Sequence, residues 1–161
     1  MKFGTDSNLY GEIAPNGYRL RGYFINEIIV VERLMDRFIA NHFTTDEDKS
    51  MQLIELILGG RMNFESKRQV FKYIVDEFYP TRFQNKEIIY SSLSKINDFR
   101  NILAHYLLDT TEDRIEQIKN GVVGFIKFSN STSLVEYNND EIAEFKVLVS
   151  GIQKMLMDGL K

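Results

Sequence analysis

The sequence predicts a mainly α-helical bundle of four or five helices, with a small β-hairpin inserted before the last helix. Apolar residues recur at spacings of three and four along most of the chain, which is the period of an amphipathic helix. Late in the chain an Asn-Gly pair flanked by β-favouring residues replaces that period. A chain of 161 residues is long enough to form one domain with its own core.

The first helix is predicted at about 18–43, after a loose N-terminal lead-in at 1–17. Four residues that break helical periodicity lie in the lead-in: Gly4, Gly11, Pro15 and Gly17. A continuous apolar stripe follows: Leu20, Phe24, Ile28, Val31, Met35 and Phe38. Flanking apolar residues widen this stripe, so the helix is expected to be buried on more than one side.

Two shorter helices are predicted next, each with a capping residue at its start. Asp46 or Thr45 is expected to cap the second helix, which Gly59-Gly60 would end. Asn63 is expected to cap the third helix, and Pro80 would stop it because proline cannot continue a helix.

The fourth helix is predicted from about Asn85 to Leu108, and it carries a polar stripe beside its apolar one. The stripe is formed by Ser94, Asn97, Asn101 and His105. Residues four apart on a helix lie about 40° apart around its axis, so Asn101 and His105 share a face. Arg100 projects about 140° from His105, so only its long side chain would bring the guanidinium near the imidazole.

A β-hairpin is predicted at about 113–129. Arg114–Lys119 and Val122–Ser129 would form its strands around the Asn120-Gly121 turn, the strongest short hairpin signal. Thr132–Tyr137 would add a third strand.

The last helix is expected to begin at Asn138 or Asn139, either of which can cap it. The sequence contains no internal repeat and no linker long enough to divide the chain. A single helical domain is therefore expected over 18–161.

Composition limits the classes of function. The net charge of −3 argues against a general nucleic-acid coat protein but leaves room for a local basic cleft. The chain has no cysteine, which excludes disulfides and thiolate metal sites and suits a cytoplasmic location. Residues 1–8 lack the apolar core of a signal peptide, and no apolar run approaches the length of a membrane span. No metal- or cofactor-binding motif occurs, so neither a metal nor a cofactor is expected.

The most informative segment is 100–105, which places an arginine, a carboxamide and an imidazole within two helical turns. Arginine binds phosphate oxygens in a two-pronged way, and histidine exchanges protons near neutral pH. We therefore predict Arg100, Asn101 and His105 as catalytic residues for RNA phosphate chemistry. Secondary substrate contacts are predicted at Asn97, Tyr106 and Lys67. The alternative for His105 is a structural histidine whose ring satisfies a neighbouring backbone group.

The segment Phe99–His105 resembles the HEPN superfamily, in which an arginine is followed directly by a polar residue and, a few positions on, by a histidine. The segment Arg61–Lys67 also resembles a helix start in the mannitol-operon-repressor group, and the resemblance covers about 50–107. It implies an α-helical, two-fold homodimer that cleaves RNA without a metal, as a toxin or phage-defence component. By this resemblance Arg100, Asn101 and His105 would line a cleft shared by two copies.

The resemblance leaves a second hypothesis open. Many similar proteins use the fold only for dimerisation or binding, so a non-catalytic dimerisation or regulatory module resembling mannitol-operon repressors is the alternative. The expected partners are RNA, a second copy of the chain, and an antitoxin or regulatory protein. The HEPN subgroup paired with nucleotidyltransferase antitoxins carries a tyrosine two residues after the histidine. Here Leu107 takes that place and Tyr106 follows the histidine directly.

Overall fold

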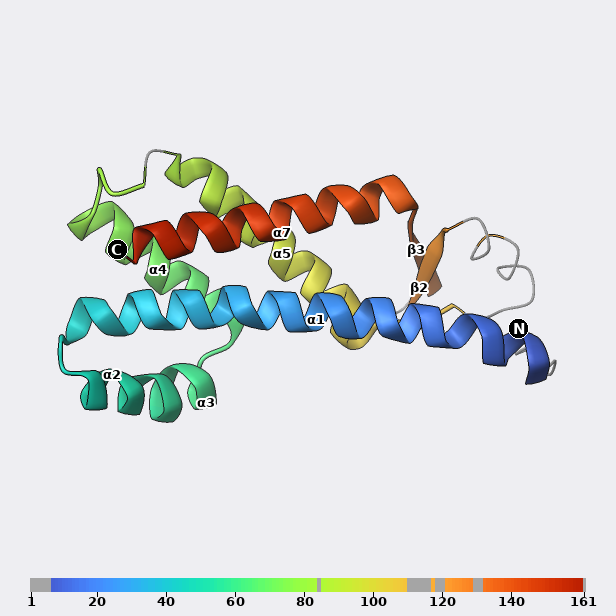
Figure 1. Ribbon diagram of the computed structural model, residues 1–161, viewed down its shortest axis with the longest axis horizontal. Coiled ribbons are helices and arrows are strands. Elements are labelled where there is room, and N and C mark those ends of the chain that lie inside the picture. Colours follow the sequence, from blue (N-terminus) through green and yellow to red (C-terminus); the bar gives the residue numbers. More distant parts are fainter. Residues whose placement is uncertain (1–6, 84, 110–116, 118–120, 129–131, 161) are drawn as a thin grey trace. The chain divides into compact units, whose positions relative to one another are not determined.

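The computed structural model describes residues 7–83, 85–109, 117, 121–128 and 132–160. In this part of the chain the fold is mainly helical, with one small antiparallel sheet before the last helix (Figure 1). The predicted fold class is therefore confirmed. No described helix is apolar over a length that would cross a bilayer.

The chain divides into two compact units. Unit 1 contains residues 1–26 and 98–147, and unit 2 contains residues 27–97 and 148–161. Three long helices contribute residues to both units: α1 (Ser7–Phe43), α5 (Lys86–His105) and α7 (Asn139–Gly159).

Helix α1 begins at Ser7, so it extends into the region where a loose lead-in was predicted. Pro15 and Gly17 both lie inside the helix. A Cβ atom placed on Gly17 would meet the side chain of Leu108, so this glycine allows close packing within unit 1 and does not break the helix. Tertiary packing here overrides a weak local helix propensity.

The second predicted helix is a continuous helical segment that we call the arm (residues 47–61). It consists of α2 (Glu47–Leu53), the π-helix η1 (Ile54–Leu58) and α3 (Gly59–Arg61). Asp46 caps it as predicted, because its Oδ1 accepts a hydrogen bond from the Lys49 amide at 3.1 Å. The predicted end at Gly59-Gly60 is wrong. Gly59 keeps right-handed helical angles, and its N–H donates to the Ile54 carbonyl in a π-helical turn.

Helix α4 (Phe64–Phe78) begins and ends as predicted. The side chain of Asn63 accepts a hydrogen bond from the Ser66 amide at 2.8 Å, and the helix ends before Pro80. Helix α5 ends at His105 and not at Leu108, because the residues that follow His105 are recruited into the sheet.

The sheet contains β1 (Leu107–Leu108), β2 (Val123–Phe128) and β3 (Thr132–Tyr137), in the order β1-β2-β3. Both pairings are antiparallel, with Leu108 opposite Phe125 and Ile126 opposite Leu134. The strand predicted at 132–137 is confirmed, and the described hairpin is β2–β3. Of the strand predicted at 114–119, Gln117 is helical and the rest lies outside the described residues.

Two local features fix the entry into α7. Gly121 adopts a φ of 82°, a left-handed conformation that favours glycine, and a Cβ atom there would clash with the side chain of Asn139, the first residue of α7. Asn138 and Glu141 form a reciprocal capping box, in which each side chain accepts the other residue's backbone N–H at 2.9 and 2.8 Å. The prediction that Asn138 caps the last helix is confirmed.

Aromatic clusters form the core of each unit. In unit 1, Phe24 packs edge-on against Phe99 and Phe145, with ring centroids 5.2 and 5.3 Å away. In unit 2, Phe38 packs against Phe71 at 5.0 Å and against Phe83 at 5.6 Å. Such pairs contribute about 0.5–1.5 kcal/mol each beyond the area they bury.

Candidate functional site

Asn101 and His105 are exposed on the last turns of α5, in unit 1, and Arg100 is half-buried there. The opposite side of the same turns is anchored, because Phe99 and Leu103 are buried in the core of unit 1. Asn101 lies two residues from each of these anchors, about 200° around the helix axis. Burial of the apolar side therefore leaves the predicted polar face in solvent.

The three predicted catalytic side chains have no partner within the described part of the chain. No hydrogen bond or ion pair there involves the side chain of Arg100, Asn101 or His105. The structure places Asn101 and His105 on one face, as the spacing predicts, whereas Arg100 projects from a different side of the helix. The imidazole is exposed and has no hydrogen bond to a described residue, which argues against the alternative of a structural histidine.

The end of α5 is held by an arginine that the sequence did not single out. Arg21 of α1 donates from Nη2 to the Tyr106 carbonyl at 2.6 Å, and its guanidinium lies 5.5 Å from the centre of the Phe125 ring. The Tyr106 amide also donates to the Ile102 carbonyl at 3.0 Å. The residue that follows His105 is thus fixed by contacts with α1, α5 and β2. Rigid support of this kind is what a precise site requires.

Tyr106 lies beside the motif, directly after α5. Its half-buried ring is 5.7 Å from the ammonium of Lys127, an exposed residue of β2. The residue next to His105 in the chain therefore offers an aromatic face with a cation beside it. Asn97, by contrast, belongs to unit 2, where its amide makes a long contact of 3.5 Å with the Glu65 carboxylate.

Lys67 is not a surface residue. Its side chain is 1% exposed, and its Nζ lies 2.6 Å from Glu32 Oε1 and 2.9 and 3.0 Å from the two carboxylate oxygens of Asp36. Burial raises the pKa of Asp36, although the Lys67 ammonium opposes that rise. The structure removes Lys67 from the set of predicted RNA contacts, because a buried and doubly paired ammonium does not reach a ligand in solvent.

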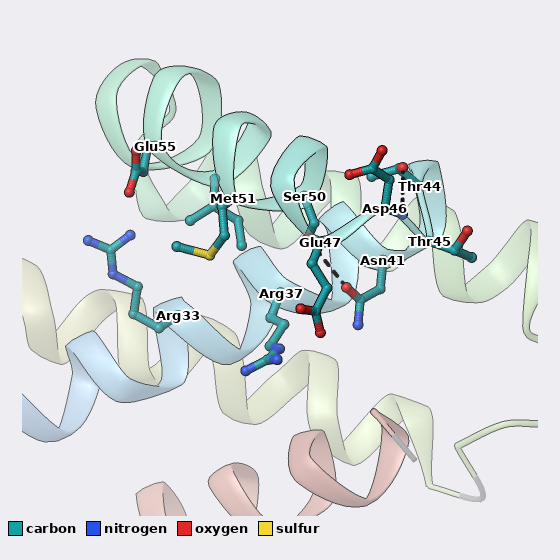
Figure 2. A pocket seen from close by; sticks show the side chains of 11 residues that line it. Arg33, Arg37, Asn41, Thr44, Thr45, Asp46, Glu47, Ser50, Met51 and Glu55 are labelled. Carbon is teal, nitrogen blue, oxygen red and sulfur yellow. Dashed lines mark hydrogen bonds between the residues drawn. The ribbon is translucent and has the colours of Figure 1, made fainter.

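A hollow of about 770 Å³ lies in unit 2 between α1 and the arm (Figure 2). Its α1 wall carries Arg33, Arg37 and Asn41, and its arm wall carries Glu47, Met51 and Glu55. Neither row is part of the sequence prediction, although in both the residues are spaced four apart within a predicted helix.

Comparison with protein families, with curated proteins and with solved structures finds no match to this chain. Within the ranges that the structure describes, no group of three or more His, Asp or Glu side chains is arranged to hold a metal ion.

Proposed function

We propose that this chain is a metal-independent, HEPN-like endoribonuclease whose active site lies at the C-terminal end of α5. One observation carries the proposal: Asn101 and His105 share an exposed face, without a partner among the described residues, on a helix end that Arg21 and β1 hold in place. Side chains without structural partners on a rigid support are available for a substrate.

The proposed reaction is an internal transfer at phosphorus. The ribose 2′-oxygen forms a bond to phosphorus, the bond from phosphorus to the 5′-oxygen breaks, and the products are a 2′,3′-cyclic phosphate and a 5′-hydroxyl. His105 takes the 2′-hydroxyl proton, and an acid gives a proton to the leaving oxygen. Arg100 stabilises the charge that develops on the phosphate oxygens, and Asn101 donates a hydrogen bond to one of them.

A homodimer follows from the number of proton-transfer groups. The reaction needs a base and an acid, but one chain supplies a single imidazole on this face. A two-fold axis beside α5 would supply the second, because an isologous interface repeats each residue. The same axis would bring a second Arg100 to the cleft, which relieves the unfavourable direction of Arg100 relative to His105 on one helix.

The test is cleavage of RNA by the purified protein in the presence of a chelator. We expect products that end in a 2′,3′-cyclic phosphate, and a loss of about 10²–10⁴-fold in rate for His105→Ala, which is the usual contribution of one proton-transfer group. Lys154→Gln, on an exposed part of α7 in unit 2, is the matched control and should cleave at the wild-type rate. Equal cleavage by His105→Ala would contradict the proposal.

A second candidate function is a non-catalytic dimerisation or regulatory module. The observation in its favour is an apolar surface on the sheet of unit 1, where Leu107 and Leu134 are both exposed and both pair with Ile126. Side chains of directly paired residues point to the same face of a sheet. This candidate predicts that Leu134→Lys abolishes association, as measured by light scattering, while His105→Ala leaves every binding property unchanged.

A further inference from the structure

We propose that the hollow between α1 and the arm binds a short zwitterionic peptide with an apolar middle, whose terminal ammonium and carboxylate reach the two ends of the hollow. This site lies within unit 2 and does not depend on the ribonuclease proposal.

The two walls of the hollow carry opposite charges in matching rows. Arg33, Arg37 and Asn41 follow one another at intervals of four on α1, so they share a face. Glu47, Met51 and Glu55 have the same spacing on the arm. The turn at 44–46 reverses the chain between the rows, which sets the ends of the rows against each other. Figure 2 shows Arg33 extended toward Glu55, and the Glu47 carboxylate near Arg37 and Asn41.

The opposite charges do not satisfy one another across the hollow. Within the described residues, the ion pair of Arg33 is with Asp36 on its own helix, at 3.6 Å, and no ion pair or hydrogen bond involves the side chain of Arg37, Glu47 or Glu55. Arg33 and Glu55 therefore stand at one end of the hollow, and Glu47 stands toward the other end with Arg37 and Asn41 near it. A ligand that carries both charges would complete this arrangement.

Two further features of the arm favour ligand binding in the hollow. A Cβ atom on Gly59 would lie 3.2 Å from Arg33 Nη1, so the glycine allows the guanidinium to lie against the arm. Ile54, the first residue of the π-helix, lines the hollow together with Met51 and provides an apolar surface between the charged ends. Single π-helical turns are frequent at functional sites.

The charge pattern selects the class of ligand. A simple anion would be attracted by Arg33 and Arg37 but repelled by Glu47 and Glu55, and a simple cation would meet the reverse, so neither is favoured. An uncharged apolar ligand would cover these charged groups without pairing them, which is costly. The hollow has the volume of ordinary small-molecule sites. The rise from Arg33 to Asn41 is about 12 Å along α1, which an extended peptide of roughly three or four residues spans.

The test measures binding to the intact protein by calorimetry with four probes: the tripeptide Ala-Leu-Ala, its C-terminal amide, its N-acetyl derivative and L-leucine. The amide lacks the carboxylate and the acetylated peptide lacks the ammonium, but both keep the apolar group, whereas leucine carries both charges on one carbon. We expect the tripeptide to bind, and the other three probes to bind at least tenfold more weakly. No binding of the tripeptide at 10 mM, or equal binding of the tripeptide and its two single-charge derivatives, would overturn the proposal.

Variants locate the binding. Arg37→Gln and Glu47→Gln change exposed side chains, so both variants are expected to fold. Each should weaken binding of the zwitterionic peptide at least tenfold. Lys154→Gln, which carries the same loss of a surface charge elsewhere in unit 2, should bind as wild type. Amide chemical shifts recorded with the tripeptide should change around Arg37 and Met51. Shifts confined to other parts of the protein, or wild-type affinity in both variants, would contradict the assignment.

Discussion

Lys67 on α4 and His105 on α5 are both polar residues of long helices, but they stand in opposite environments. Lys67 is buried and paired with two carboxylates, whereas His105 is exposed and has no partner in the described part of the chain. A buried charge must be paired, because an unpaired one loses its hydration without compensation. An exposed imidazole carries no such requirement and remains available for chemistry.

The largest expected change in stability comes from replacing the buried lysine, Lys67. Lys67→Met leaves the Asp36 carboxylate buried without its main partner, and we expect the free energy of unfolding to fall by about 3–5 kcal/mol. Urea denaturation measures it. Lys72→Met is the matched control, because Lys72 forms a partly exposed ion pair with Asp76 and its loss should cost at most about 1 kcal/mol. Equal losses in the two variants would show that Lys67 is not a structural residue.

The same variant has a pH dependence with a definite sign. Burial raises the pKa of Asp36 while Lys67 lowers it, so removal of Lys67 leaves burial and the nearby Glu32 to raise it further, with only Arg33 in opposition. A carboxyl whose folded pKa lies above its unfolded value destabilises the fold increasingly as the pH rises through the folded pKa. The deficit of Lys67→Met relative to wild type should therefore be smaller at pH 4 than at pH 7. A deficit that does not change with pH would contradict this account.

Arg21→Met weakens the support of the exposed site. It removes the 2.6 Å hydrogen bond to the Tyr106 carbonyl, and a charged donor to such an acceptor contributes about 1.5–3 kcal/mol. We expect a loss of stability in that range, together with slower RNA cleavage. Restoring a cation with Arg21→Lys should recover part of the cleavage rate. Cleavage at the wild-type rate by Arg21→Met would show that Arg21 does not support the catalytic residues.

Asp76 gives a smaller effect with a different pH dependence. Hydrogen bonds from Lys72 and Lys86, at 2.7 and 2.6 Å, lower the pKa of Asp76 to about 2. A folded pKa below the unfolded value means that the carboxylate stabilises the protein above about pH 4 and ceases to do so as the pH falls toward 2. Asp76→Asn should cost about 1 kcal/mol at pH 7, in line with a partly exposed network, and progressively less below pH 4. Thermal melts across this pH range measure it.

The smallest expected change in stability comes from replacing the exposed residues Asn101 and His105. Asn101→Ala and His105→Ala remove side chains that have no partner within the described residues, so the free energy of unfolding should change by less than about 0.5 kcal/mol. Chemical denaturation of both variants at pH 7 checks this. A loss comparable to that of Lys67→Met would mean that the two side chains serve the fold.

Local signals in the sequence predicted much of the fold. The caps at Asp46, Asn63 and Asn138 depend on hydrogen bonds to residues three positions away, so they are visible in a short window. The helical start at Ser7 and the continuation of the arm through Gly59 are not predictable in this way, because glycine and proline are local signals of a break that packing tolerates here.

The sequence predicts only part of the candidate site, because only part of it depends on local spacing. Helical spacing is enough to place Asn101 and His105 on one face. It does not show that Arg21, 85 residues away in sequence, holds the Tyr106 carbonyl. Nor does it show that Lys67 pairs with carboxylates more than 30 residues away on α1. Contacts between distant segments depend on the tertiary fold and leave no local signal.

The most direct test of the central claim, that the exposed end of α5 carries out chemistry, is the rate at which His105→Ala cleaves RNA in chelator under conditions where it is as stable as wild type. The account predicts a rate lower by about 10²–10⁴-fold, with cyclic-phosphate ends in the wild-type products. Cleavage by the folded variant at the wild-type rate, or no cleavage of RNA by the wild-type protein, would contradict it.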